Sequence, residues 1–316
     1  MTNDSTQPVG GMNRRTFLKQ ASAGTAVLSA SSHAAVGPRR AAARNTKLAT
    51  VPLGEYRVTR LIAGYNPIGG HSHLTASLSR QMRAYFTVER TVAFLQHCEE
   101  LGINTFQFDL IEKTEKALKI LWDGGSALQF ICLHAERPKD VSIDRAKELK
   151  AFALVHHGGV TDTLFRQGKA EKVHDYVKKV HDAGLLAGVS SHCPANIARI
   201  ADEGWENDLF MTCFHYVTRT REEMEQEFGT ATVGEPFVEA DPDRMTAVIR
   251  QVNQPCLAFK ILAAGRRCDN SSSVRAAFKY AFDKIKPTDA VIVGMFPRDA
   301  DEVQENVDHT LKYGKA

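Results

Sequence analysis

Residues 169–190 read KAEKVHDYVKKVHDAGLLAGVS, and this stretch joins the two signals that decide the fold. Its first part has apolar side chains three or four positions apart, which is the spacing of one helix face. Gly184 follows, and glycine is the residue that most often ends a helix. The last six residues form a short, mostly apolar run that is typical of a strand buried on both faces. We therefore predict a helix over 169–183 and a strand over 185–190.

The same alternation of strand and helix continues along the chain from residue 60 to its end. The predicted strands cover residues 60–64, 104–109, 128–133, 152–156, 185–190, 208–213, 256–261 and 290–293. The predicted helices cover residues 87–101, 113–122, 142–150 with Ser142 as cap, 169–183, 194–203, 241–252, 273–284 and 299–312. Eight buried strands that alternate with eight helices predict an α/β fold, a (β/α)8 TIM barrel.

Two short runs precede the first core strand. Residues 47–51 and 56–59 flank Pro52-Leu53-Gly54-Glu55, which predicts an N-terminal β-hairpin. A doubly wound open sheet is the alternative to the barrel. It is disfavoured because residues 64–70, GYNPIGG, do not match the G-x-G-x-x-G turn of dinucleotide-binding sheets.

The N-terminus carries an export signal. Asn13-Arg14-Arg15-Thr16-Phe17-Leu18-Lys19 is followed by a weakly apolar run over 21–30 and by Ser32-His33-Ala34. This order is typical of a twin-arginine signal peptide cut after Ala34. We therefore predict a signal peptide over 1–34, a linker over 35–46 and the barrel over 47–316. The twin-arginine translocase is then a partner during export, and the mature protein is periplasmic or otherwise extracytoplasmic.

Composition excludes several other roles. The chain has 316 residues, is 43% hydrophobic and carries a net charge of +3, which falls to about +1 without residues 1–34. Such a balance gives no electrostatic case for nucleic acid or an anionic membrane surface. No later segment approaches the roughly 20 apolar residues of a membrane span. The six cysteines form no CxxC pair. Cys132, Cys213 and Cys256 lie in apolar runs, where we expect buried free thiols.

Histidines and carboxylates gather where the predicted strands end. In a parallel barrel these positions surround one mouth, which holds the active site. They are His71, His73, Asp109, Glu112, His134, Glu136, His156, His157, His192 and His215, and Lys260 lies within the predicted seventh strand. Imidazole titrates near neutral pH and is a common metal ligand, so such a mouth suits acid–base chemistry or metal binding.

Three segments resemble the aldo/keto reductase family. They are residues 58–70 (VTRLIAGYNPIGG), residues 183–192 (AGLLAGVSSH), and residues 290–295 (AVIVGM) followed by 302–306 (EVQEN). The resemblance implies a barrel that seats NADP(H) across its seventh and eighth strands. It implies as cofactor-binding residues Gly294, Met295, Glu305, Asn306, Ser190 and His192.

The chain departs from the catalytic tetrad of that family, which is an Asp, a Tyr, a Lys and a His. Gln107 stands at the Asp position with Asp109 two residues later, and residues 110–113 hold no Tyr. His134 replaces the Lys, and the His persists as His156 or His157. Met295 stands where a basic residue grips the 2′-phosphate. Because the Tyr donates the proton in that family, we expect ordinary carbonyl reduction to be slow.

Three functions therefore remain open. The first is an exported oxidoreductase that acts on a small carbonyl or sugar-type substrate. Its catalytic residues would be His157, His156, His134, Asp109 and Lys260. The second is a Zn- or Mn-dependent lyase, isomerase or hydrolase. Its candidate ligands are His134, Glu136, His157 and His192. The third is a non-catalytic ligand-binding barrel.

Overall fold

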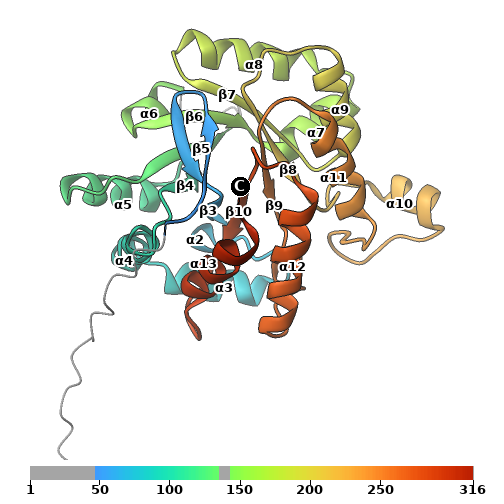
Figure 1. Cartoon of the computed structure of the whole chain (residues 1–316). Coiled ribbons are helices and arrows are strands. Elements are labelled where there is room, and N and C mark those ends of the chain that lie inside the picture. Colours follow the sequence, from blue (N-terminus) through green and yellow to red (C-terminus); the bar gives the residue numbers. More distant parts are fainter. Residues whose placement is uncertain (1–46, 135–142, 316) are drawn as a thin grey trace, which may run out of the picture. The chain divides into compact units, whose positions relative to one another are not determined.

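The computed structural model describes residues 47–134 and 143–315 (Figure 1). The predicted signal peptide (1–34) and linker (35–46) lie outside the described residues and stay predictions. Glu136 and the predicted helix cap Ser142 lie outside them as well.

Eight parallel strands close into a barrel in the order β10-β3-β4-β5-β6-β7-β8-β9. This confirms the predicted (β/α)8 TIM barrel. The strands are β3 (Leu61–Gly64), β4 (Thr105–Phe108), β5 (Gln129–His134), β6 (Ala151–His156), β7 (Leu186–Ser191), β8 (Leu209–Cys213), β9 (Cys256–Phe259) and β10 (Ala290–Gly294). Strand β9 ends at Phe259, so Lys260 follows this strand and does not lie within it as predicted.

All eight predicted helices are present, and they cover the outside of the barrel (Figure 1). They are α4 (Val88–Glu100), α5 (Glu112–Asp123), α6 (Ile143–Glu148), α8 (Glu171–Asp182), α9 (Pro194–Asp202), α11 (Asp241–Gln251), α12 (Ser271–Lys284) and α13 (Glu302–Tyr313).

Five further short helices lie in the loops that follow the carboxyl ends of strands, and the sequence reading missed them. They are α2 (Asn66–Gly69), α3 (Ala76–Tyr85), α7 (Gly158–Arg166), α10 (Arg221–Phe228) and the 3₁₀ turn η1 (Ala263–Gly265). Helix α7 begins with two glycines, which read as a turn in the sequence. Residues of α2, α3, α7 and η1 line the mouth of the barrel, whereas α10 does not.

The hairpin of β1 (Thr50–Leu53) and β2 (Tyr56–Thr59) covers the amino end of the barrel, as the blue ribbon in Figure 1 shows. Val51, Leu53 and Val58 are buried together with inward side chains of the barrel strands. The hairpin is therefore a plug that keeps water out of the barrel interior. Its turn is shorter than predicted, because Pro52 lies within β1, where an edge strand tolerates proline.

The barrel closes where its last and first strands meet at two glycines. Gly294 of β10 pairs with Gly64 of β3. A Cβ on Gly64 would lie 2.9 Å from the backbone nitrogen of Gly294, closer than real Cβ atoms approach backbone. Only glycine allows this approach, and both residues line the cavity described below.

The six cysteines of the chain are free thiols, and most of them are buried. Cys132, Cys213 and Cys256 are buried free thiols, as predicted, and Cys98 is buried and free as well. Cys193 is partly buried and Cys268 is exposed, and both are free as well. Among residues 47–134 and 143–315, no helix has the length and apolarity to cross a membrane.

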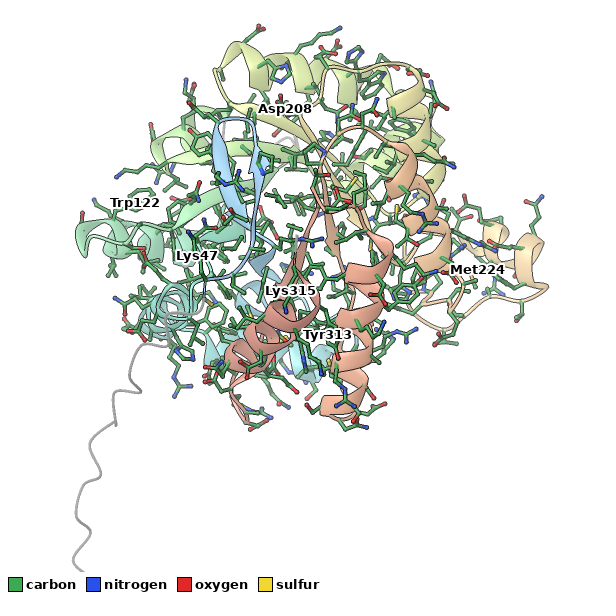
Figure 2. All side chains as sticks on the ribbon, viewed as in Figure 1. Lys47, Trp122, Asp208, Met224, Tyr313 and Lys315 are labelled. Carbon is green, nitrogen blue, oxygen red and sulfur yellow. The ribbon has the colours of Figure 1, made fainter. Side chains whose placement is uncertain are left out.

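An insertion between β8 and α11 is held by one buried ion pair. Arg219 contacts both carboxylate oxygens of Asp241, at 2.6 and 2.8 Å, and both side chains are 2% exposed. Beyond this anchor α10 projects away from the barrel at the labelled Met224 (Figure 2). The chain then returns to the mouth, where Glu235 lines the cavity.

Candidate active site

A cavity of about 520 Å³ opens at the carboxyl end of the barrel. All eight strands, or the loops that follow them, contribute to its lining, as expected for the active site of this fold. Its polar lining includes Tyr65, His71, His73, Gln107, His157, Ser190, His192, Thr218, Glu235 and Lys260. Much of the remaining lining is apolar and includes Leu74, Leu78, Met82, Leu133, Met211, Phe259 and Phe296.

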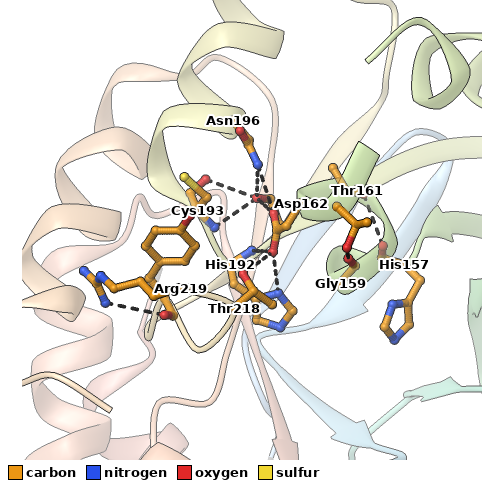
Figure 3. Close-up of polar contacts among 12 residues, drawn as sticks. His157, Gly159, Thr161, Asp162, His192, Cys193, Asn196, Thr218 and Arg219 are labelled. Atoms are coloured by element: carbon orange, nitrogen blue, oxygen red, sulfur yellow. Dashed lines mark hydrogen bonds and ion pairs between the residues drawn. The ribbon is translucent and has the colours of Figure 1, made fainter. Parts of the chain in front are cut away.

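His192 and Asp162 form a buried carboxylate–imidazole pair on one side of the cavity (Figure 3). Nδ1 of His192 lies 2.9 Å from Asp162 Oδ2, and the Asp162 side chain is fully buried. A carboxylate only accepts hydrogen bonds, so this contact places the imidazole proton on Nδ1. The Nε2 atom of His192 is then the nitrogen with a lone pair, and His192 lines the cavity.

Asp162 accepts hydrogen bonds from four further donors. They are Ser191 Oγ (2.5 Å), His192 N (3.2 Å), Asn196 Nδ2 (3.0 Å) and Thr218 Oγ1 (2.8 Å), several of which Figure 3 shows. Burial by itself raises the pKa of Asp162, but the hydrogen bonds outweigh it and hold that pKa below its usual range. Burial also lowers the pKa of His192, more than Asp162 raises it. At neutral pH the pair is therefore a charged carboxylate beside a neutral imidazole, which is the state of a general base.

Lys260, His73 and Glu235 form a second chain of contacts. Lys260 Nζ lies 3.1 Å from His73 Nε2, and His73 Nδ1 lies 2.8 Å from Glu235 Oε1. Asn66 Nδ2 also approaches His73 Nε2, at 3.3 Å. The carboxylate fixes the proton of His73 on Nδ1, so that Nε2 accepts from the amine. The three residues come from three separate loops and meet only at the mouth.

Two of these residues are electrostatically unusual. Burial lowers the pKa of Lys260, and this effect outweighs Cys213 and Glu235, which raise it. Burial raises the pKa of Glu235, but its contact with His73 outweighs this and keeps the pKa below its usual range. Perturbed lysines in a cavity are typical of functional sites.

The predicted catalytic residues separate into two groups. His157 and Lys260 line the cavity, whereas His134 and His156 do not. Their rings lie 6.3 and 5.0 Å from the ring of Tyr176 on α8, between the barrel and its outer helices. Side chains of a strand alternate between its two faces, and the inward positions belong to the preceding residues, Leu133 and Val155.

The other residues predicted to lie at the mouth of the barrel also fall into two groups. His71, His73 and His192 line the cavity, but Asp109 and the buried His215 do not. Asp109 acts at a distance: burial lowers the pKa of His71, and Asp109 partly opposes this.

Asp162 and Glu235 were not among the sequence candidates. Asp162 lies inside α7, a helix that the sequence reading missed, and Glu235 lies in the long insertion. Asp162 stands four residues into a segment that begins with Gly158-Gly159, and a helical reading of that segment would have turned its side chain toward β7. No local signal marks Glu235.

The predicted cofactor residues do not gather at one place. Gly294, Ser190 and His192 line the cavity, whereas Met295, Glu305 and Asn306 do not. At the start of α13 the carboxylate of Asp301 accepts from Gln304 N, and Glu302 accepts from Phe296 N. These carboxylates meet the positive end of the helix, where a phosphate would otherwise bind. The residues at the start of this helix do not favour a phosphate group there, and binding of NADP stays a prediction.

Two of the four candidate metal ligands line the cavity. His157 and His192 line the cavity, His134 does not, and Glu136 lies outside the described residues. Within the described ranges, no three His, Cys, Asp or Glu side chains are grouped to hold a metal ion. A Zn or Mn site that includes Glu136 stays a prediction.

His156 makes a prediction for the pH dependence of stability. Burial lowers its pKa from 6.5 to about 3. Between these values the unfolded chain binds a proton that the native protein does not. The free energy of unfolding should therefore fall as the pH drops below about 6.5, by roughly 1.4 kcal/mol per pH unit for this histidine. Urea unfolding between pH 7 and pH 5 measures the slope.

The matched variants for that experiment are His156→Gln and His97→Gln. The first removes the buried titrating ring, so its stability should depend less on pH. The second changes a histidine that lies on the surface of α4 and contacts Asp301. An unchanged slope in His156→Gln would contradict the prediction. Part of the slope remains in any case, because burial also lowers the pKa of His215 to about 4.

Comparison with known proteins supports the barrel fold. No family model and no curated protein matches the chain. A putative aldo-keto reductase from Pseudomonas aeruginosa is similar over 85% of this chain and 96% of its own, with 17% identity and a TM-score of 0.54. The glycerol dehydrogenase AKR11B4 from Gluconobacter oxydans covers 84% of this chain and 95% of its own, at 12% identity and a TM-score of 0.45.

A third neighbour has a different activity. It is a truncated 3-deoxy-D-arabino-heptulosonate 7-phosphate synthase from Thermotoga maritima, with 14% identity, a TM-score of 0.48 and coverage of 85% and 91% of the two chains. The neighbours thus include aldo-keto reductases and other TIM-barrel enzymes. At these identities the likeness establishes the barrel and leaves the activity open.

Proposed function

We propose that this chain is an enzyme that uses acid–base chemistry on a small carbonyl or sugar-type substrate. His192 is its general base, oriented by Asp162, and Lys260 acts at the carbonyl group. The observation that carries the proposal is the convergence of two chains of contacts on one cavity, the buried Asp162–His192 pair and the partly exposed Glu235–His73–Lys260 chain. A binding protein has no need of two such chains in one pocket.

The chemistry follows from the charge of each group. A proton on carbon next to a carbonyl is removed easily only when the developing negative charge on oxygen is stabilised. A cationic group at Lys260 supplies that stabilisation, and the neutral His192 accepts the proton. The Asp162 carboxylate then stabilises the imidazolium that forms. Because the Asp162–His192 pair is largely shielded from water, its interaction is stronger than it would be at the surface.

The lining also suggests the shape of the substrate. Polar groups come from the loops after β3, β6, β7, β8 and β9, whereas Leu78 and Met82 of α3 add an apolar wall. A substrate with one oxygen-rich end and one apolar end would satisfy both.

Hydrogen–deuterium exchange tests the proposal without knowledge of the full reaction. A panel of aldoses, ketoses and hydroxyketones is incubated with the protein in D₂O, and proton NMR follows the signal of the carbon next to the carbonyl. We expect exchange with at least one compound, and about a 10²–10⁴-fold slower rate in His192→Gln. His97→Gln on the surface of α4 is the matched control and should exchange normally.

The result that contradicts the proposal is a panel without any protein-dependent exchange, or exchange that His192→Gln leaves unchanged. The same samples, supplied with NADPH and followed by absorbance, test the more specific prediction of an oxidoreductase. Consumption of NADPH without exchange would favour that prediction over the proposal made here.

A further inference from the structure

Lys260 and His73 share an uncommon backbone conformation. The φ angle is 58° at Lys260 and 55° at His73, in the left-handed region that side-chain-bearing residues rarely adopt. Each such residue costs of order 1–3 kcal/mol and persists where the surrounding structure requires it. Here the two strained residues contact each other, with Nζ 3.1 Å from Nε2. The strain therefore serves this contact.

The contact is arranged to take a proton from the lysine. Glu235 holds the proton of His73 on Nδ1, which leaves Nε2 as an acceptor that faces the amine. Among the described residues, no carboxylate forms an ion pair with Lys260 that would keep it an ammonium ion. Burial favours the neutral amine by lowering the pKa of Lys260, and it outweighs the opposing effect of the nearby Glu235 carboxylate. A desolvated lysine beside a base is a competent nucleophile.

We propose that Lys260 is a covalent catalyst that forms an imine with the carbonyl carbon of the substrate, and that Glu235 and His73 are positioning residues that move its proton. This inference rests on the proposed function, because it requires a carbonyl substrate. It specifies how Lys260 acts at the carbonyl group: by a covalent bond to carbon, after it has lost its proton.

The step balances without any further reactant. His73 takes one proton from the ammonium group of Lys260, and the nitrogen lone pair then attacks the carbonyl carbon. A carbon–nitrogen bond forms, and the carbonyl π pair moves to oxygen, which receives the proton from His73. The nitrogen gives up a second proton to the hydroxyl group, which leaves as water, and a protonated imine remains. This cation draws electrons from the neighbouring carbon, whose proton passes to His192.

Borohydride trapping tests the imine directly. The full-length protein is mixed with glycolaldehyde, or with the compound that exchanges fastest, and treated with sodium borohydride. Reduction converts an imine into a stable secondary amine, which mass spectrometry of peptides locates. We expect one dominant adduct, on Lys260, at least tenfold more abundant than on Lys279. Lys279 is an exposed lysine on α12 paired with Asp283.

Three variants separate the proposal from a structural effect. Lys260→Arg keeps a positive charge but cannot form an imine, so it should lose both trapping and exchange. Lys279→Arg is the matched control and should lose neither. His73→Asn should form the Lys260 adduct at least tenfold more slowly, with its pH profile shifted to higher pH. Circular dichroism and thermal unfolding establish that each variant is folded.

The outcomes distinguish this inference from the function on which it rests. Exchange that persists in Lys260→Arg, or adducts spread over surface lysines with Lys260 unlabelled, would overturn the imine and leave the acid–base proposal intact. A specific Lys260 adduct without any exchange would support the imine and overturn the role given to His192.

Discussion

Replacement of Asp162 by Ala is expected to lower the free energy of unfolding by about 3–5 kcal/mol. The Asp162 carboxylate accepts hydrogen bonds from four residues. Ser191 lies on β7, His192 in the loop that follows β7, Asn196 on α9 and Thr218 in the insertion. Without it these buried donors lose their partner together, and each unsatisfied group has a desolvation cost. Urea unfolding at neutral pH measures the change.

Asp162→Asn separates the effect on the reaction from the effect on folding. The amide keeps the size of the side chain and one acceptor oxygen, but it carries no charge to stabilise the imidazolium and can reverse the tautomer of His192. We expect the deuterium exchange rate to fall about 10³–10⁴-fold, as when a buried carboxylate behind a catalytic histidine is neutralised. The fall in stability should be smaller than in Asp162→Ala.

Asp208→Asn is the matched control for both measurements. Asp208 also accepts from a histidine and a backbone amide, namely His181 Nε2 at 2.8 Å and Ala187 N at 2.7 Å. Its side chain is 31% exposed, however, and the pair lies outside the cavity. The control should lose little stability and no activity. Equal losses in the two variants would show that Asp162 has only a general structural role.

The barrel was predictable because its signals are local. Each of the seven helices that precede a barrel strand forms with it a contiguous run of about 14–24 residues, as in 169–190. The parallel closure follows from the repetition of that unit. The hairpin was predictable for the same reason. The loop helices were not, because α2, α3 and α7 are short and contain or follow residues that also form turns.

The site was predictable only in part, because its contacts are not local. Lys260, His157 and His192 stand at strand ends, and that position alone brings them to the mouth. His134 and His156 also stand at strand ends, but one residue earlier or later reverses the face of a strand on which a side chain lies. A shift of one position along the strand therefore decides whether a side chain lies in the cavity or against the outer helices.

The contacts of the two carboxylates, Glu235 and Asp162, are even less predictable from the sequence than the face on which a histidine lies. Glu235 is separated from His73 by 162 positions, and Asp162 from His192 by 30. Neither distance along the chain carries a pattern that predicts a contact. The pairs are set by how the loops fold over the mouth, so they emerge only when the insertion and α7 are placed in space.

Gly158→Ala is expected to slow deuterium exchange by about 10²-fold, because it displaces the catalytic base. A Cβ at residue 158 would lie 2.9 Å from Ser190 Oγ and 3.0 Å from His192 Cε1. Both side chains line the cavity, and His192 must move away while Asp162, one turn further along α7, stays in place. A displacement near 1 Å in a catalytic group costs about this factor.

Gly159→Ala provides the control, because the two glycines are adjacent in the first turn of α7. Its Cβ would lie 3.4 Å from the nearest atom, Cε1 of His157, which is close to ordinary van der Waals contact. Since alanine favours a helix by up to about 1 kcal/mol over glycine, this variant should exchange normally and be at least as stable as the parent protein. If Gly158→Ala exchanged as fast as Gly159→Ala, the position of His192 would not limit the reaction and its assignment as the base would fail. A slow Gly158→Ala beside a normal Gly159→Ala would instead locate the chemistry at the edge of α7 that faces β7, where the Asp162–His192 pair lies.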